Sequence, residues 1–278
     1  MLRGFYTAAA GMLSQQRRTE MLSNNLANAN TPGYKSDQSV TRAFPEMLLS
    51  RMDSESIPTK NSLSFQTSSP IGSIHTGAYI QELVPLFSQG DIRETGLATD
   101  AALVEENMPI NEETGLKSSL LFAVQTGEGG LRYTRNGRFT INVAGELTLA
   151  GNRVLSSTGQ PIRLNSDQFK MTENGLILSE EGGQVAQIDV RFAEDVRELV
   201  KEGNGLYRTE NRDLPSAIGL QDVAYQLKQG FIERSNVDIS KAYTDMMTSY
   251  RSFEANQKVL QAYDKSMDKA VNEIGRIG

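Results

Sequence analysis

The residues with the clearest capacity for chemistry are three pairs of adjacent acidic side chains, Glu105 and Glu106, Glu112 and Glu113, and Glu180 and Glu181. A glycosidase holds two carboxylates on opposite sides of a sugar, so a sugar hydrolase is the enzyme to which such pairs could point. Adjacent acids in polar loops are usually solvated, however. The chain also has no Trp, the commonest platform for stacking against a sugar. We therefore expect solvated acids and no glycosidase site.

Other catalytic and ligand-binding patterns are equally weak. The single histidine, His75, lies between turn-forming residues and is expected to be an exposed loop side chain. The absence of Cys removes thiolate nucleophiles, thiolate metal sites and disulfides. The glycine-rich run that begins at Gly127 has neither the spacing nor the Lys of a phosphate-binding loop. The sequence predicts no catalytic residue, no cofactor and no metal site.

Composition excludes further classes of protein. The formal net charge of −6 argues against a nucleic-acid partner. No run approaches the roughly 18 apolar residues of a membrane-spanning helix. The longest apolar run near the N-terminus, residues 8–13, contains a Gly and is followed by Arg17, Arg18 and Glu20, so we expect no cleaved signal peptide.

The elements that dominate the chain are two helical segments at its ends. Over residues 239–274, apolar or near-apolar residues recur in steps of four and three, which is the pattern of one seam in a coiled coil. The seam comprises Ile239, Tyr243, Met246, Tyr250, Phe253, Gln257, Leu260, Asp264, Met267, Val271 and Ile274. Its polar members Gln257 and Asp264 either fix the register, or the helix rotates there so that Tyr263 and Ala270 are buried.

Residues 2–30 have a similar pattern and are the expected partner. Their seam comprises Leu2, Phe5, Ala9, Met12, Gln16, Thr19, Ser23 and Leu26, broadened by Leu13, Met21 and Leu22. The helix should end at Thr31-Pro32-Gly33, because the residue before a proline is disfavoured in the α region. Four asparagines precede this turn, at Asn24, Asn25, Asn28 and Asn30. They indicate either a frayed helix end or a hydrogen-bonding patch that faces another chain.

The middle of the chain is predicted to be rich in β-strands. Residues 54–73 are rich in Ser, Thr and Pro and are expected to form an exposed excursion, followed by a strand over residues 78–87. Residues 105–115 are expected to form a polar loop. Across residues 97–215, short alternating runs are separated by turn dipeptides, which favours an antiparallel meander or small barrel. These dipeptides are Asn136-Gly137, which is the strongest hairpin signal, Ala144-Gly145, Asn174-Gly175 and Gly182-Gly183.

The predicted fold is therefore of the α+β class. Long N- and C-terminal helices pair as a coiled-coil stalk, and an antiparallel β-rich domain is inserted between them. The expected segments are 1–33, an N-terminal axial helix; 34–96, a connection with extended elements; 97–222, the β-rich domain; and 223–278, a C-terminal axial helix.

Four stretches in this order resemble one family, the axial proteins of the bacterial flagellum. NNLANANTPGYK (24–35) is similar to their N-terminal signature, and FSQGDIRETG (87–96) to a turn of their rod and hook members. YTRNGRFTINVAGELTLAGNRVL (133–155) resembles their β domain, and residues 233–272 resemble their C-terminal helix. The likeness is best to the basal-body rod proteins of the distal-rod type. Residues 54–73 and 99–119 depart from the family pattern.

This resemblance implies a structural subunit that polymerises into a helical tube and transmits torque from motor to hook. The subunit would leave the cell through the flagellar type III export apparatus and contact copies of itself and other rod and hook proteins. It would have no enzymatic activity, no cofactor and no small-molecule substrate. The alternative is a secreted, stalked β-domain module that binds at or near the cell wall.

Exposed apolar stripes on the terminal helices would mark the surfaces that contact other subunits. The expected subunit-packing residues are Leu2, Phe5, Ala9, Met12, Leu22, Asn24, Asn28, Asn30, Pro32, Gly33, Ile239, Tyr243, Met246, Tyr250, Phe253, Gln257, Leu260, Asp264 and Met267.

Overall fold

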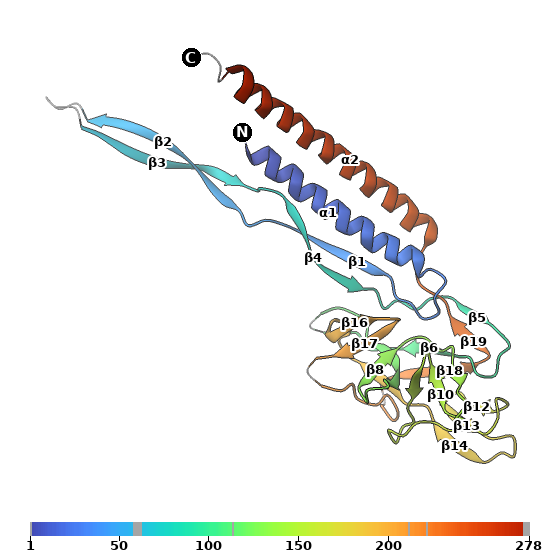
Figure 1. The fold of residues 1–278 in the computed structure, drawn as a ribbon. Helices are drawn as coiled ribbons and strands as arrows, with labels where there is room; N and C mark the ends of the chain where they lie inside the picture. The colour runs from blue at the N-terminus through green and yellow to red at the C-terminus, as the bar shows by residue number, and fades with distance from the viewer. Residues whose placement is uncertain (1, 58–62, 113, 211, 221, 275–278) are drawn as a thin grey trace. The chain divides into compact units, whose positions relative to one another are not determined.

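A computed structural model describes residues 2–57, 63–112, 114–210, 212–220 and 222–274 of the chain (Figure 1). The chain divides into two compact units, each built from separate stretches of sequence. We call the first the helix–ribbon unit; it comprises Met1–Ser23, Gln38–Leu83 and Lys241–Gly278. We call the second the β body; it comprises Asn24–Asp37 and Val84–Ser240.

Two long helices belong largely to the helix–ribbon unit. Helix α1 spans Leu2–Ala27, and α2 spans Ile239–Lys269 and continues as a π-helical segment, η2, over Ala270–Ile274. The helices run antiparallel (Figure 1) and touch where α2 side chains reach glycines of α1. The hydroxyl of Tyr263 occupies the space beside Gly4, and the amide of Asn256 occupies the space beside Gly11. A side chain at either glycine would have to displace its neighbour.

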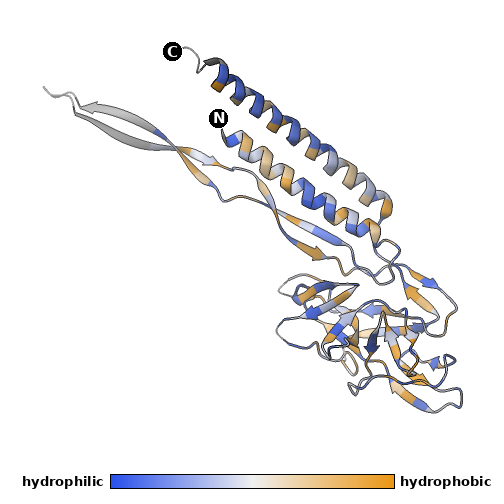
Figure 2. Ribbon diagram, viewed as in Figure 1, coloured by the Kyte–Doolittle hydropathy of each residue, from blue (hydrophilic) through white to orange (hydrophobic). Residues whose placement is uncertain are grey.

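The predicted coiled-coil stalk is wrong. In the part of the chain that the structure describes, strands outnumber these two helices, and the helices do not pack closely along their length. The predicted seam residues Ile239, Tyr243 and Tyr250 are 46%, 55% and 50% exposed, whereas Ala242 and Ser249 are buried. The buried residues of α2 are therefore small, and the larger apolar residues of the same face, Met246, Phe253 and Leu260, are only half-buried. The helix thus does not insert large apolar knobs into a partner as a coiled coil does. Figure 2 shows the hydrophilic character of the C-terminal half of α2.

Two-stranded ribbons complete the helix–ribbon unit. Strand β1 (Asp37–Ala43) pairs with β4 (Ala78–Pro85), which confirms the strand predicted over residues 78–87. Strands β2 (Met47–Ile57) and β3 (Leu63–Ile74) pair antiparallel from Met47↔Ile74 to Ile57↔Leu63. The Ser-rich segment 54–73 is thus largely ribbon, and its residues 58–62 lie outside the described residues. No helix in the described ranges is long and apolar enough to cross a membrane.

The β body is built around one large antiparallel sheet and several smaller pairings. The large sheet has the order β16-β17-β8-β7-β11-β10-β9, with β15 also paired to β7. Its strands are β7 (Ser119–Gln125), β8 (Leu131–Thr134), β9 (Thr140–Ile141), β10 (Leu147–Leu149), β11 (Asn152–Val154), β15 (Val190–Ala193), β16 (Leu199–Gly203) and β17 (Leu206–Thr209). A 3₁₀ turn, η1 (Val196–Glu198), leads into β16.

Two of the smaller pairings join segments that are distant in sequence, and a third joins neighbouring segments. Strand β5 (Ile92–Glu94) pairs with β19 (Phe231–Glu233), and β6 (Ala101–Asn107) pairs with β18 (Ala224–Gln229). Strands β12 (Lys170–Met171), β13 (Leu176–Leu178) and β14 (Gln184–Gln187) form a three-stranded sheet.

Strand β7 is the centre of the body because both of its faces are buried. Leu120, Phe122 and Val124 belong to the larger apolar cluster, whereas Leu121 belongs to a second cluster with Tyr133. This division follows from the period of two along a strand, which sends successive side chains to opposite faces.

Three of the four predicted turns are confirmed. Ala144-Gly145 joins β9 to β10, Asn174-Gly175 joins β12 to β13, and Gly182-Gly183 joins β13 to β14.

The hairpin predicted at Asn136-Gly137 is wrong. Strand β8 pairs with β7 and β17, while β9 pairs with β10. Neither residue of the dipeptide has the positive φ that a type I′ turn requires. Gly137 is instead needed for a close backbone approach: a Cβ there would collide with the carbonyl oxygen of Ala101, whose N–H donates to the carbonyl of Gly137 (2.9 Å).

Candidate functional site

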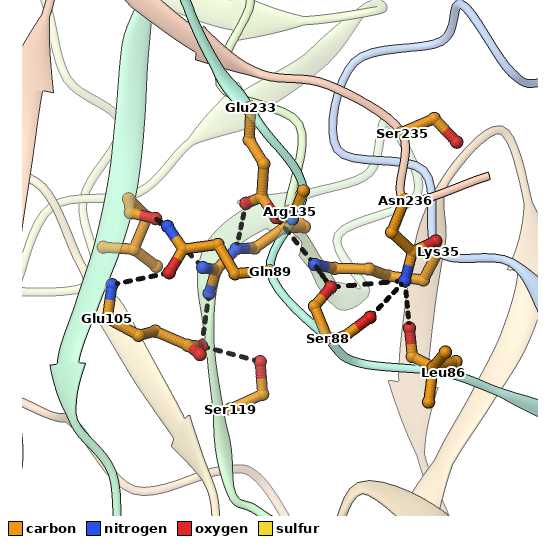
Figure 3. Close-up of polar contacts among 12 residues, drawn as sticks. Lys35, Leu86, Ser88, Gln89, Glu105, Ser119, Arg135, Glu233, Ser235 and Asn236 are labelled. Carbon is orange, nitrogen blue, oxygen red and sulfur yellow. Dashed lines mark hydrogen bonds and ion pairs between the residues drawn. The ribbon is translucent and has the colours of Figure 1, made fainter. Parts of the chain in front are cut away.

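Four charged side chains are buried together in the β body and form the most organised polar site of the chain (Figure 3). Lys35 follows the turn after α1, Glu105 lies in β6, Arg135 follows β8, and Glu233 ends β19. Their side chains are at most 2% exposed. Two cations therefore face two carboxylates in a region without solvent.

Arg135 is the centre of this ion cluster. Its Nε donates to Glu233 Oε2 (2.6 Å), and its Nη1 donates to Glu105 Oε1 (2.7 Å). The guanidinium also donates to the backbone carbonyls of Leu120 (2.6 Å) and Leu103 (2.9 Å). These contacts tie β6, β7 and β19 to one side chain, which suits the planar fork of arginine and not the single point charge of lysine.

Glu233 links Arg135 to the N-terminal segment. Its Oε1 accepts from Lys35 Nζ (2.7 Å) and from the backbone N–H of Gly90 (2.8 Å). Lys35 Nζ also donates to the carbonyl of Ser88 (2.8 Å). Each oxygen of Glu233 therefore has its own cation.

Asn236 continues the polar network next to the cluster. Its Oδ1 accepts from the backbone N–H of Ser36 (2.8 Å), and its Nδ2 donates to the carbonyl of Leu86 (2.7 Å) and to the hydroxyl of Ser88 (3.0 Å). One side chain thus connects three stretches of the chain that are far apart in sequence.

Burial and pairing set the protonation of the cluster. Burial, and then the nearby guanidinium of Arg135, lower the pKa of Lys35 although Glu233 acts in the opposite direction. Burial would raise the pKa of Glu233, but Arg135 and Lys35 together hold it below its usual value. Burial opposes the charge of Arg135 as well, yet Glu233 and Glu105 raise its pKa. Pairing therefore favours the charged forms of Arg135 and Glu233, whereas burial disfavours the charged form of Lys35.

The arrangement suits a structural role. All four charges are engaged by one another or by backbone groups, so none is left to act as a nucleophile or a general base. Among the residues that the structure describes, no group of three or more His, Cys, Asp or Glu side chains could hold a metal ion.

The acidic pairs predicted to be solvated lie in different surroundings. Glu106, Glu112, Glu180 and Glu181 are exposed, and Glu113 lies outside the described residues. The prediction is wrong for Glu105, whose carboxylate is buried against Arg135 and also accepts from Ser119 Oγ (2.9 Å). The polar loop predicted from residue 105 begins later, because β6 continues to Asn107.

His75 lies in an exposed loop, as predicted. It pairs with Glu46 (3.2 Å), and its own side chain is 50% exposed.

The predicted subunit-packing residues are distributed over both units. On α1 and the following turn, Leu22 and Gly33 are buried; Phe5, Ala9, Met12, Asn28 and Pro32 are half-buried; and Asn24 and Asn30 are exposed. On α2, Met246, Phe253 and Leu260 are half-buried, and Ile239, Tyr243, Tyr250, Gln257, Asp264 and Met267 are exposed. Leu2 begins α1. Of the two residues expected to be buried if the helix rotates at its polar seam positions, Tyr263 does face α1, whereas Ala270 is exposed. The seam residue Asp264 is exposed.

The asparagine run is ordered by hydrogen bonds, so the frayed helix end is wrong. The hydroxyl of Tyr34 donates to Oδ1 of Asn24 (2.8 Å) and of Asn25 (3.1 Å). Asn25 also donates to the carbonyl of Asp37 (2.8 Å) and accepts from its N–H (2.9 Å). These bonds close the turn that presents Lys35 to the cluster.

Sequence reasoning missed Lys35, Glu105, Arg135, Glu233 and Asn236 as site residues. Four of them do lie in the stretches that resemble the flagellar family: Lys35 ends the first, Arg135 lies in the third, and Glu233 and Asn236 lie in the fourth. Their placement in these motifs was the signal that could have identified them.

The helix–ribbon unit has an apolar groove beside α1. It has a volume of about 580 Å³. Its lining includes Tyr6 and Leu13 of α1 and Tyr79 of β4, with Arg3 and Arg17 among the polar residues. Tyr6 and Leu13 are 62% and 56% exposed.

Comparisons with known proteins match both ends and the whole length of the chain. Residues 5–35 match a family described as "Flagella basal body rod protein", and residues 228–273 match "Flagellar basal body rod FlgEFG protein C-terminal". The chain is 54% identical over 278 residues to the flagellar hook-basal body complex protein FlhO of Bacillus subtilis, with 100% of each chain covered. It is 28% identical over 286 residues to the flagellar basal-body rod protein FlgG of Borreliella burgdorferi, with 98% of each covered.

A third relative is the flagellar basal-body rod protein FlgF of Caulobacter vibrioides, which is 27% identical over 280 residues with 100% of each chain covered. These relatives confirm the resemblance described above and do not support the stalked wall-binding module. The chain therefore belongs to the flagellar basal-body rod protein family, and it has a structural role in the rod of the bacterial flagellum.

Proposed function

We propose that this subunit packs with copies of itself and with other rod or hook proteins into a helical tube that transmits torque from motor to hook. The observation that carries the proposal is the set of large apolar side chains that the terminal helices leave exposed. On α2, Ile239, Tyr243 and Tyr250 are about half exposed, and on η2, which continues it, Val271 is 71% exposed. Large apolar side chains that are exposed at successive turns of one helix are typical of an interaction surface.

Relatives and motifs support the same proposal. FlhO is described as a protein of the hook-basal body complex, and the family profiles match residues 5–35 and 228–273, which contain most of α1 and all of α2. The apolar groove beside α1 adds a surface that a neighbouring subunit could cover. Three points stay predictions. They are the assignment of the subunit-packing residues, the division into four segments with axial helices at 1–33 and 223–278, and the distal position of the subunit in the rod.

We further propose that the protein is not an enzyme and that it reaches the rod through the flagellar type III export apparatus. Support for the first point comes from the ion cluster, which engages its charged groups internally. Support for the second comes from the family, whose resemblance to this chain includes both terminal motifs. No nucleic acid and no small-molecule substrate are part of the proposal.

The test is complementation of a strain that lacks the gene. Tyr243→Lys places a charge on the exposed stripe of α2 and should abolish swimming and rod assembly in basal-body images. The matched control is Val143→Lys, which changes a fully exposed side chain of the β body by the same substitution and should leave swimming intact. A deletion strain that swims with intact rods would refute the role in the rod. Equal effects of the two variants would refute the packing role of α2.

A further inference from the structure

A short segment from the N-terminal part of the chain belongs to the β body without contributing to its apolar cores. Asn24–Asp37 groups with Val84–Ser240. Among the described residues, however, the two buried apolar clusters of the body draw all their members from residues 87–227. Because apolar burial is the main driving force of folding, the body has what it needs to form a core without this segment. The segment itself buries only two apolar side chains, Ala29 and Tyr34, so polar contacts must contribute much of its attachment.

Those contacts are hydrogen bonds to the edges of the body. The N–H of Gly33 donates to the carbonyl of Glu233 (2.8 Å), and the N–H of Ser36 donates to Oδ1 of Asn236 (2.8 Å). The carbonyl of Ser36 accepts from the N–H of Leu86 (2.8 Å). Each such bond replaces one that the same group makes with water, so its net contribution is small. A stronger interaction must provide most of the attachment.

One ion pair, Asp37–Lys201 (2.9 Å), is partly open to solvent, so the fully buried charges of the ion cluster provide the larger share. Without the segment, the body would contain one guanidinium, Arg135, and two buried carboxylates, Glu105 and Glu233. Oε1 of Glu233 would keep only the N–H of Gly90 as a partner. A buried carboxylate without its cation is strongly unfavourable. The ammonium of Lys35 removes this excess negative charge when the segment docks.

We propose that Lys35 is a latch: it fastens Asn24–Asp37 to the β body by neutralising the cluster, and the body stays folded when the latch is open. The chain therefore has a second folded state, in which the segment that follows α1 is detached and the core around β7 is intact. This state is a property of the fold and does not depend on assembly with other subunits.

The latch is tested by amide hydrogen exchange on the full chain. Lys35→Met keeps most of the side-chain stem and removes the charge. It should accelerate exchange at the Gly33 and Ser36 amides by about 100-fold or more, while the amides of β7 exchange as in the wild type. The control is Lys117→Met, which removes an exposed lysine of the body and should change neither group. Loss of protection in β7, or unchanged exchange at Gly33 and Ser36, would overturn the proposal.

A second variant separates charge from packing. Lys35→Met combined with Glu233→Gln leaves Arg135 and Glu105 as a neutral pair, so the segment amides should exchange at least about tenfold more slowly than in Lys35→Met alone. Exchange that is as fast or faster in the double variant would show that neutralisation is not the cause.

The wild type gives an independent readout. With increasing denaturant, the segment amides should open in a separate, earlier step than those of β7. One common opening step would contradict the latch.

Discussion

Replacing Arg135 by Met should destabilise the β body more than any surface substitution, because Arg135 is the cation that lies within the body and pairs with both buried carboxylates. The side chain of Arg135 has no exposed surface, and its loss also removes the donors to two backbone carbonyls. Breaking a buried ion pair by removal of one partner costs about 3–5 kcal/mol. For a domain of this size, each kcal/mol lowers the midpoint of thermal unfolding by roughly 2–4 °C. We therefore expect a midpoint lowered by roughly 6–20 °C.

The assay can use the tyrosines of the body, since the chain has no Trp. Tyr133 and Tyr207 are each 1% exposed, so near-ultraviolet circular dichroism reports the packing around them. The control is Arg163→Met, because Arg163 pairs with Glu146 through a side chain that is 76% exposed. Its expected effect is below about 1 kcal/mol.

Arg135→Lys should fall between the wild type and Arg135→Met, because one ammonium cannot reach both carboxylates and both carbonyls. Denaturation curves for Arg135→Met that coincide with those for Arg163→Met would refute the assignment of Arg135 as the centre of the body.

Two further predictions concern the same unit. Gly137→Ala should lower the free energy of unfolding by about 1–3 kcal/mol, because its Cβ would collide with the carbonyl of Ala101. The control Gly127→Ala places its Cβ in open space and should be nearly neutral. Equal urea midpoints for the two variants would contradict the close approach of Gly137 to Ala101. The pKa of Glu233 is lowered in the folded state, so its contribution is fully present above its unfolded value of 4.5 and is lost as the pH falls through the lower folded value. Urea midpoints of the wild type should therefore fall below about pH 5 more steeply than those of Glu233→Gln, and parallel pH profiles would contradict this.

Turns were predictable where a local sequence decides the backbone. Gly145, Gly175 and Gly182 all have positive φ, and each lies in a turn that joins paired strands. Gly137 carries the same sequence signal, but its glycine is required by the backbone of Ala101, which is distant in sequence. Asn136-Gly137 and Asn174-Gly175 have the same sequence, but only the second forms a hairpin turn. The contact of Gly137 with Ala101 accounts for the difference.

The ion cluster could not be predicted from local patterns because each member is an ordinary charged residue in its own stretch. Lys35 and Glu233 are separated by 198 positions in the sequence, yet their charged atoms are 2.7 Å apart. Glu105 has an acidic neighbour and a polar sequence after it, which favours a solvated loop, but β6 pairs with β18 and directs its carboxylate to Arg135. Pairing between strands that are distant in sequence decides which charged side chains are buried. The spacing of residues within one stretch carries no information about that pairing.

Periodicity located both terminal helices but did not identify which face of α2 turns inward. An apolar seam indicates burial somewhere, and it does not distinguish burial within one chain from burial against a neighbour. In α2 the buried residues are Ala242 and Ser249, and the tyrosines next to them, Tyr243 and Tyr250, are exposed. Contacts within one chain therefore do not explain why α2 has large apolar side chains at exposed positions such as Tyr243 and Tyr250.

The N-terminal signature consequently has two separable parts. Asn25, Gly33 and Lys35 are buried and engaged inside the β body, whereas Asn24 and Asn30 are exposed. Substitutions in the buried part should act on the attachment of the segment and on stability before any assembly step. Substitution of Asn30 should leave the isolated subunit unchanged and act only where another chain is present, whereas Asn24 also accepts the hydrogen bond from Tyr34 that closes the turn. A loss of swimming caused by a change in this motif thus identifies a packing contact only when the stability of the purified variant equals that of the wild type.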